Sequence, residues 1–232
     1  MVAAQGLLTL AMLEEVRAAE PPVRLSAIFF EPGQPGQVAE ELRSLGDVVV
    51  ALDGPLGPPA DGRAERACDS QLRSRGVPPR GPDPLMSQMA DLLTGLGVFR
   101  PAAGDLEGVV PEGAYEDQLV FETNADGVYC AMQGRRLPAR RHPLGVQRRI
   151  EELEQDHVID EGGNLWHRRI EELDAIAAAL CAHRYAVGHA CWIGDPGEGV
   201  VVLPGSSLPD EFTSAGVLPP VERLELPRPP KA

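Results

Sequence analysis

The chain has 232 residues, of which 43% are hydrophobic and 24% charged, a composition typical of one globular α/β domain or at most two small ones. Its formal net charge of −14 argues against general adhesion to nucleic acid or to anionic membranes. No apolar run of about 18 residues is present, and the first residues lack the basic segment of a secretory signal. We therefore expect a cytoplasmic protein.

The predicted elements alternate between strands and helices along the chain. In chain order, apolar spacing predicts strands at 7–13 and 23–30, a helix at 36–45, a strand at 47–52, helices at 65–76 and 83–97, a strand at 118–122, helices at 145–155 and 164–187, and strands at 190–193 and 199–203. This alternation predicts a single α/β domain with a mixed sheet over residues 1–217. We expect the Pro-rich tail, 218–232, to be extended or poorly ordered.

Two carboxylates end strands that are otherwise apolar. Asp53 closes the run VVVALD before a Gly-Pro turn, and Glu122 closes LVFE before a polar turn. In α/β proteins, side chains at the carboxyl ends of strands commonly form the active site. The alternative is structural: Asp53 caps the following loop, and Glu122 is simply solvated at its strand end.

A third carboxylate, Asp174, lies in the apolar stripe of the helix predicted at 164–187. It follows Leu173 and stands four residues after Ile170, so it lies at the edge of that stripe or inside it. A buried carboxylate is costly unless a cation or metal compensates it. If Asp53, Glu122 and Asp174 converge, their hard oxygen ligands suit Mg²⁺ or Mn²⁺, which are the usual ions of phosphodiester hydrolysis.

Positive charge gathers in the segment 134–149, GRRLPARRHPLGVQRR, which holds no acid. Its arginines are Arg135, Arg136, Arg140, Arg141, Arg148 and Arg149. One interpretation is a phosphate-binding patch, since guanidinium groups bind phosphate through two parallel hydrogen bonds. The other is a solvated helix face that pairs with the following EELEQD, and the sequence does not separate the two.

The four cysteines and five histidines give no sign of a zinc site. The cysteines, Cys68, Cys130, Cys181 and Cys191, are widely spaced and form no CxxC pair, and the histidines show neither HxH nor HExxH spacing. We therefore expect buried or half-buried free thiols rather than disulfides or metal ligands.

Several blocks in sequence resemble the predicted RNase H-like nuclease family, catalogued as domain of unknown function 429. These blocks are VVVALDGPLGPP, GRAERACDSQLRSRG, LVFETNAD, ELDAIAAALCAHRYAVG and IGDPGEGVVVLPG, and the resemblance is strongest over residues 45–205. It implies an RNase H-like fold, a five-stranded mixed sheet flanked by helices, with acidic residues that converge on a divalent metal ion.

The resemblance implies roles for particular residues. Asp53, Glu122 and Asp174 match the family's acidic positions and would be metal ligands and catalytic groups. Arg63 and Asp69 match its "R…CD" pattern and would contact substrate, or else form a salt bridge that fixes the loop to the following helix. From the basic segment, Arg140 and Arg141 are our candidates for substrate contact.

Two departures from the family pattern bear on catalysis. The family opens with a strand ending in GxD, which supplies the first metal ligand, whereas no aspartate precedes the strand predicted at 7–13. Either the natural start lies upstream of Met1 or this ligand is lost. In addition, Asn124 and Ala125 stand where the family shows an aromatic residue and proline, and Asp126 is an extra acid there.

The sequence thus supports two functional hypotheses. The first is a metal-dependent nuclease or phosphodiesterase that acts on nucleic acid or another phosphodiester, with Mg²⁺ or Mn²⁺ held by the three acids. The second is a catalytically impaired relative that uses the same fold as a binding or scaffold module. An actin-like nucleotide-binding protein ranks third, because the segments GPLG and GDPGEG lack the setting of a phosphate loop.

Overall fold

The computed structural model describes residues 2–4, 7–16, 23–60, 62–81, 85–97 and 118–214. Its strands are β1 (Val2–Ala4), β2 (Leu7–Thr9), β3 (Ala11–Val16), β4 (Arg24–Phe29), β5 (Val48–Asp53), β6 (Gln118–Thr123), β7 (Val158–Ile159), β8 (Ala190–Asp195) and β9 (Gly199–Pro204). Its helices are α1 (Pro35–Ser44), α2 (Ala67–Ser74), α3 (Leu85–Leu96), α4 (Ala125–Gln133), α5 (Pro143–Gln155) and α6 (Ile170–Ala186), with a 3₁₀ turn at Leu165–His167.

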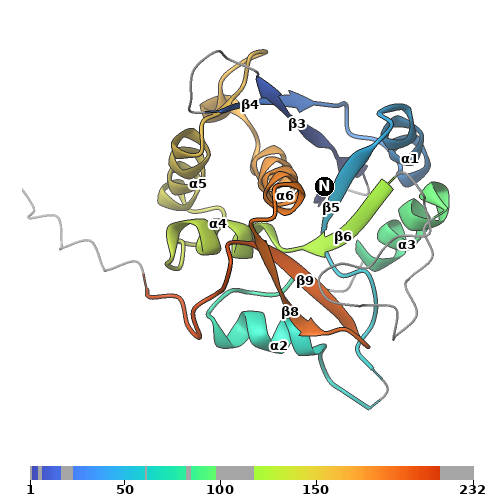
Figure 1. Ribbon diagram of the computed structural model, residues 1–232, viewed down its shortest axis with the longest axis vertical. Helices are drawn as coiled ribbons and strands as arrows, with labels where there is room; N and C mark the ends of the chain where they lie inside the picture. Colours follow the sequence, from blue (N-terminus) through green and yellow to red (C-terminus); the bar gives the residue numbers. More distant parts are fainter. Residues whose placement is uncertain are drawn as a thin grey trace, which may run out of the picture.

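Mixed sheets flanked by helices make this a single α/β domain, as predicted (Figure 1). In the larger sheet, of order β5-β6-β9-β8, the first three strands are parallel and β8 forms an antiparallel hairpin with β9. The second sheet has the order β3-β4-β7, and β1 and β2 form a two-stranded sheet. Among the described residues, no ladder joins β3 to β5, so the five-stranded sheet implied by the resemblance is divided here.

Most predicted elements are present, and the differences have local causes. The strand predicted at 7–13 divides into β2 and β3, with Leu10 between them. The long helix predicted from residue 164 starts only at Ile170, because Arg168 and Arg169 keep extended backbone angles. Helix α4 was not predicted, although Asn124 caps it by accepting a hydrogen bond from the Gly127 N–H. The tail at 218–232 and the boundary at 217 lie outside the described residues.

The two faces of β5 and β6 are covered by different helices. Side chains alternate along a strand; thus Ala51 and Phe121 point toward α6, where the ring of Phe121 lies 5.2 Å from that of Tyr185. Val50 and Leu52 point the other way, into the core formed with α1 and α3. Figure 1 shows α1 and α3 together beside β5 and β6, and α6 near the centre of the view, on the other side of β5.

The thiols behave as predicted. All four cysteines are free, and Cys68, Cys130 and Cys181 are buried. Burial raises the pKa of Cys68 and of Cys181 to about 12, so both stay protonated at neutral pH and are poor nucleophiles. Within the described part of the chain, no helix is both long and apolar enough to cross a membrane.

Candidate functional site at the carboxyl ends of two parallel strands

Asp53 is a buried carboxylate at the carboxyl end of β5, with 1% of its surface exposed. Arg80 binds both of its oxygens, with Nε 3.0 Å from Oδ1 and Nη2 2.7 Å from Oδ2. The Ala125 N–H, in the first turn of α4, donates to Oδ1 at 2.9 Å. The negative charge of Asp53 is therefore stabilised by a guanidinium and by the positive end of a helix.

Asp174 and Asp53 both accept a hydrogen bond from Arg80. Asp174 lies on the buried side of α6 and is fully buried, as its place in the apolar stripe indicates. Its Oδ2 accepts from Arg80 Nη2 at 3.2 Å and from Arg140 Nε at 2.5 Å. Its Oδ1 is buried and has no hydrogen-bond partner among the residues that the structure describes. Burial, and secondly the charge of Asp53, raise the pKa of Asp174 to about 6.

Glu122 lies on the opposite face of the sheet. Glu122 pairs in register with Leu52, one position before Asp53, and a shift of one residue reverses the face. Its carboxylate is bound by Arg66 through two hydrogen bonds of 2.6 and 2.7 Å and by the Leu56 N–H at 2.9 Å. The structure brings Asp53 and Asp174 together and places Glu122 in a separate ion pair.

Arg66 is the centre of that second ion pair. It is 2% exposed and also binds both oxygens of Asp69, at 2.8 and 2.9 Å. Although burial alone lowers the pKa of Arg66, its hydrogen bonds with Glu122 and Asp69 raise it overall. Asp69, a candidate for substrate contact, is thus held in a salt bridge at the start of α2.

Arg63, the second candidate in this segment, pairs with a buried carboxylate that the sequence analysis did not single out. Glu198, in the turn between β8 and β9, accepts from Arg63 Nη1 at 3.0 Å and from the N–H groups of Ala60 and Ala67 at 2.8 Å each. These hydrogen bonds lower the pKa of Glu198. Glu198 therefore fastens the loop after β5 to the start of α2.

The basic segment 134–149 turns inward at two points. Arg140 contacts Asp174, and the buried Arg149 pairs with Asp126 in the first turn of α4. Arg141, 79% exposed, lies 3.6 Å from Glu171. Within the following EELEQD, Glu151 pairs with Arg148.

At the pair of Asp53 and Asp174, sequence reasoning missed Arg80. It follows the stretch GVPP in a segment with no periodicity, so no pattern marked it. Asp126 had been noted as an extra acid, and its proximity contributes to the electrostatics of Arg80 and of Asp174. The only advance signal for an arginine here is the need of a buried Asp53 for a counter-charge.

A divalent cation fits part of this arrangement. Among the described residues, no group of three or more His, Cys, Asp or Glu side chains is arranged to hold a metal ion, so the predicted three-acid centre is not assembled there. Two carboxylates do converge on Arg80. No described residue donates to Asp174 Oδ1, so this oxygen remains for a further ligand. Mg²⁺ is often bound by only one or two protein carboxylates together with water and substrate phosphates.

Comparison with known proteins places the chain in a family. The family model described as "Protein of unknown function (DUF429)" matches residues 8–198, and the chain therefore belongs to this family. No curated protein and no solved structure matches the chain. The matched region includes Asp53, Glu122 and Asp174, and the description of the family states no activity.

The Arg66–Glu122 pair yields a stability prediction. Arg66→Ala leaves Glu122 buried without a counter-charge and should lower the free energy of unfolding by about 3–5 kcal/mol, measured by urea denaturation. Arg66→Met combined with Glu122→Leu should recover most of this loss. The exposed pair of Arg73 and Glu65 is the matched control, and Arg73→Ala should change stability by about 1 kcal/mol or less. If Arg66→Ala and Arg73→Ala lowered the free energy of unfolding equally, Arg66 would not be the essential counter-charge of a buried Glu122.

Asp174 yields a pH prediction. Its pKa is raised from 3.8 to about 6 on folding, so between these values the folded state binds more protons than the unfolded state. The contribution of Asp174 to stability therefore falls as pH rises from 4 to 7, by about 3 kcal/mol at most. The free energy of unfolding of wild type minus that of Asp174→Asn should decrease over this range. A difference that is flat or increases would refute the shift.

Proposed function

We propose that this DUF429 chain is a divalent-metal-dependent nuclease or phosphodiesterase with an RNase H-like fold, in which Asp53 and Asp174 bind Mg²⁺ or Mn²⁺. The observation that carries the proposal concerns the fully buried Asp174, which shares one guanidinium with Asp53. Its Oδ1 finds no hydrogen-bond partner within the described part of the chain. Burial, and secondly the charge of Asp53, raise the pKa of Asp174, and a perturbed carboxyl pKa of this kind is common in active sites. The site lies at the carboxyl end of β5, a place that is typical of active sites in α/β proteins.

The chain's own residues have distinct roles in this proposal. Asp53 is a pre-oriented ligand, because the Ala125 N–H and the start of α4 fix its carboxylate. Arg80 and Arg140, whose side chains are 20% and 21% exposed, can exchange a carboxylate for a phosphate and so bind the substrate. When bound, a divalent ion supplies an activated water and stabilises the leaving oxygen.

Glu122 is outside the proposed metal site. Arg66 engages both of its oxygens on the far face of the sheet, and the Leu56 N–H adds a third hydrogen bond. Its proposed role is structural, since it holds the loop after β5 against the start of α2.

A second candidate is a binding or scaffold module without catalysis. The observation in its favour is charge balance: Arg80 and Arg140 together compensate Asp53 and Asp174 without a metal ion. This module would keep the same fold and the same ion pairs, and it would show no response to divalent cations.

Thermal unfolding with and without divalent ions separates the two candidates. If the ion binds only the folded state, Mg²⁺ or Mn²⁺ at about 100 times Kd should stabilise the wild type by about 3 kcal/mol, a rise in Tm of several degrees. Asp174→Asn should abolish the rise. Glu122 lies on the opposite face of the sheet from Asp53 and Asp174. Glu122→Gln should therefore lower the Tm without added ions and keep the rise in Tm that the ions cause.

The corresponding activity test uses fluorescent single-stranded DNA, single-stranded RNA and an RNA–DNA hybrid. Cleavage of at least one of them with Mn²⁺, lost in Asp53→Asn and kept in Glu122→Gln, is the expected result. A wild type whose Tm does not respond to either ion and that cleaves none of these substrates would favour the binding module instead.

A further inference from the structure

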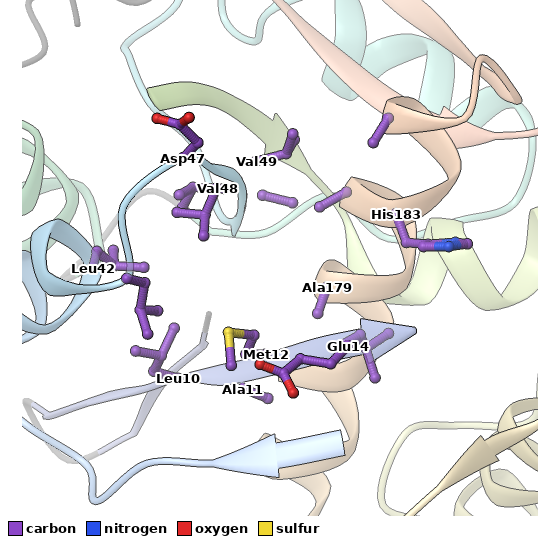
Figure 2. A pocket seen from close by; sticks show the side chains of 16 residues that line it. Leu10, Ala11, Met12, Glu14, Leu42, Asp47, Val48, Val49, Ala179 and His183 are labelled. Atoms are coloured by element: carbon purple, nitrogen blue, oxygen red, sulfur yellow. The ribbon is translucent and has the colours of Figure 1, made fainter. Parts of the chain in front are cut away.

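The first turns of helix α6 hold two carboxylates, those of Glu171 and Asp174, in fixed positions. Leu173 and Ile176 are fully buried, so the helix packs closely against its neighbours there. A cavity of about 440 Å³ lies between β3 and β5 (Figure 2) and meets α6 from Ala179 onward, five residues after Asp174. The backbone around the two acids is therefore well packed, and a change in their ion pairs requires movement of the partner side chains.

Glu171 and Asp174 are neighbours on one side of α6. They stand three residues apart in the helix, a spacing that places Cβ atoms about 5–6 Å apart. Asp174 is fully buried, whereas the side chain of Glu171 is 17% exposed. Two carboxylates thus lie about one helical turn apart, the first near the surface and the second in the interior.

Arg140 lies between these two carboxylates. Its Nε and Nη2 are each 2.5 Å from Asp174 Oδ2, and its Nη1 is 3.8 Å from Glu171 Oε1. A separation of 3.8 Å is too long for a hydrogen bond, so Arg140 binds Asp174 directly and lies close to Glu171 without binding it. One guanidinium therefore faces both carboxylates, and the buried carboxylate is its partner in this structure.

Arg80, the other arginine at Asp174, is held more firmly than Arg140. It forms two parallel hydrogen bonds with Asp53, of 3.0 and 2.7 Å, and a third with Asp174, of 3.2 Å. Paired hydrogen bonds of this kind orient a guanidinium strongly. Among the described residues, Arg140 donates to a single oxygen, Asp174 Oδ2, and a second carboxylate lies beside it. Arg140 is therefore the arginine that exchanges its partner more readily.

The backbone beside Arg140 is anchored on α5. The His142 N–H donates to the Ala139 carbonyl at 2.9 Å. A Cβ added at Gly145, in the first turn of α5, would lie only 2.2 Å from the oxygen of that carbonyl, so the loop and the helix are in close contact. An exchange of partner by Arg140 is therefore a rotation of its side chain and leaves the loop backbone in place.

We propose that Arg140 gates the proposed metal site: its guanidinium leaves Asp174 when a divalent ion binds there, moves about one turn toward the start of α6 and pairs with Glu171. This inference rests on the proposed function, because it concerns the same metal site. Arg140 leaves because two cations at one carboxylate repel each other. Glu171 is the more exposed of the two acids, so the movement brings Arg140 closer to solvent, where the phosphate of a substrate arrives.

The test measures the binding of Mn²⁺ to the full chain by the loss of the electron paramagnetic resonance signal of free Mn²⁺. Arg140→Gln should bind Mn²⁺ about tenfold more tightly than wild type, because one competitor for Asp174 is removed. Glu171→Gln should weaken binding about fivefold, since the displaced guanidinium loses its acceptor. In the Arg140→Gln background the same change should weaken binding by about twofold or less, because directly coupled side chains have non-additive effects.

Glu151→Gln is the matched control, because Glu151 pairs with Arg148 of the same basic segment; it should leave the affinity for Mn²⁺ unchanged within about twofold. Equal weakening by Glu171→Gln in both backgrounds would overturn the gate alone, because Glu171 would then act only through its charge. Absence of Mn²⁺ binding by wild type and by Arg140→Gln alike would overturn the metal site, and the gate with it.

A second measurement needs neither a metal ion nor a variant of Arg140. Asp174→Asn removes the charge of the buried carboxylate, so Arg140 should pair with Glu171 in this variant. Adding Glu171→Gln should then lower the Tm by about 2–4 °C, against about 1 °C or less in the otherwise wild-type chain. Circular dichroism verifies that each variant folds. Equal shifts in Tm in the two backgrounds would overturn the gate.

Discussion

Buried carboxylates at the ends of β5 and β6 impose the strongest constraint on this structure. A carboxylate that leaves water needs a counter-charge or hydrogen bonds in a fixed geometry. Asp53 and Glu122 point to opposite faces of the sheet, so one arginine cannot serve both. The connection after β5 supplies Arg66 to Glu122 and Arg80 to Asp53. The two described parts of this connection, 54–60 and 62–81, meet this double requirement.

The sequence predicts which carboxylates are unusual and fails to predict how they group. Asp53 and Asp174 were identified from an apolar strand and an apolar helical stripe, and they do meet. The same alternation that marks a strand could have placed Glu122 on the other face, but only once the register with β5 was known. The register depends on long-range pairing, which no local pattern contains.

Partners of buried charges are harder to predict than the charges themselves. Arg80 is 27 residues from Asp53, and Arg66 is 56 residues from Glu122. Neither arginine lies at a periodic position, because a counter-charge needs only one correctly placed side chain. The basic segment illustrates the same limit: its density of arginine suggests an exposed patch, yet Arg140 and Arg149 point inward to Asp174 and Asp126. Composition reveals charge, whereas pairing depends on the fold.

Helix α6 connects the two regions of interest. Its first turns carry Asp174 to the carboxyl end of β5, and its later turns carry Ala179 and Ala182 to the cavity between β3 and β5. Five residues separate Asp174 from Ala179, a rise of about 7.5 Å along the helix. Because the sheets are not joined by a ladder within the described residues, the position of β3 relative to β5 depends on packing against α6.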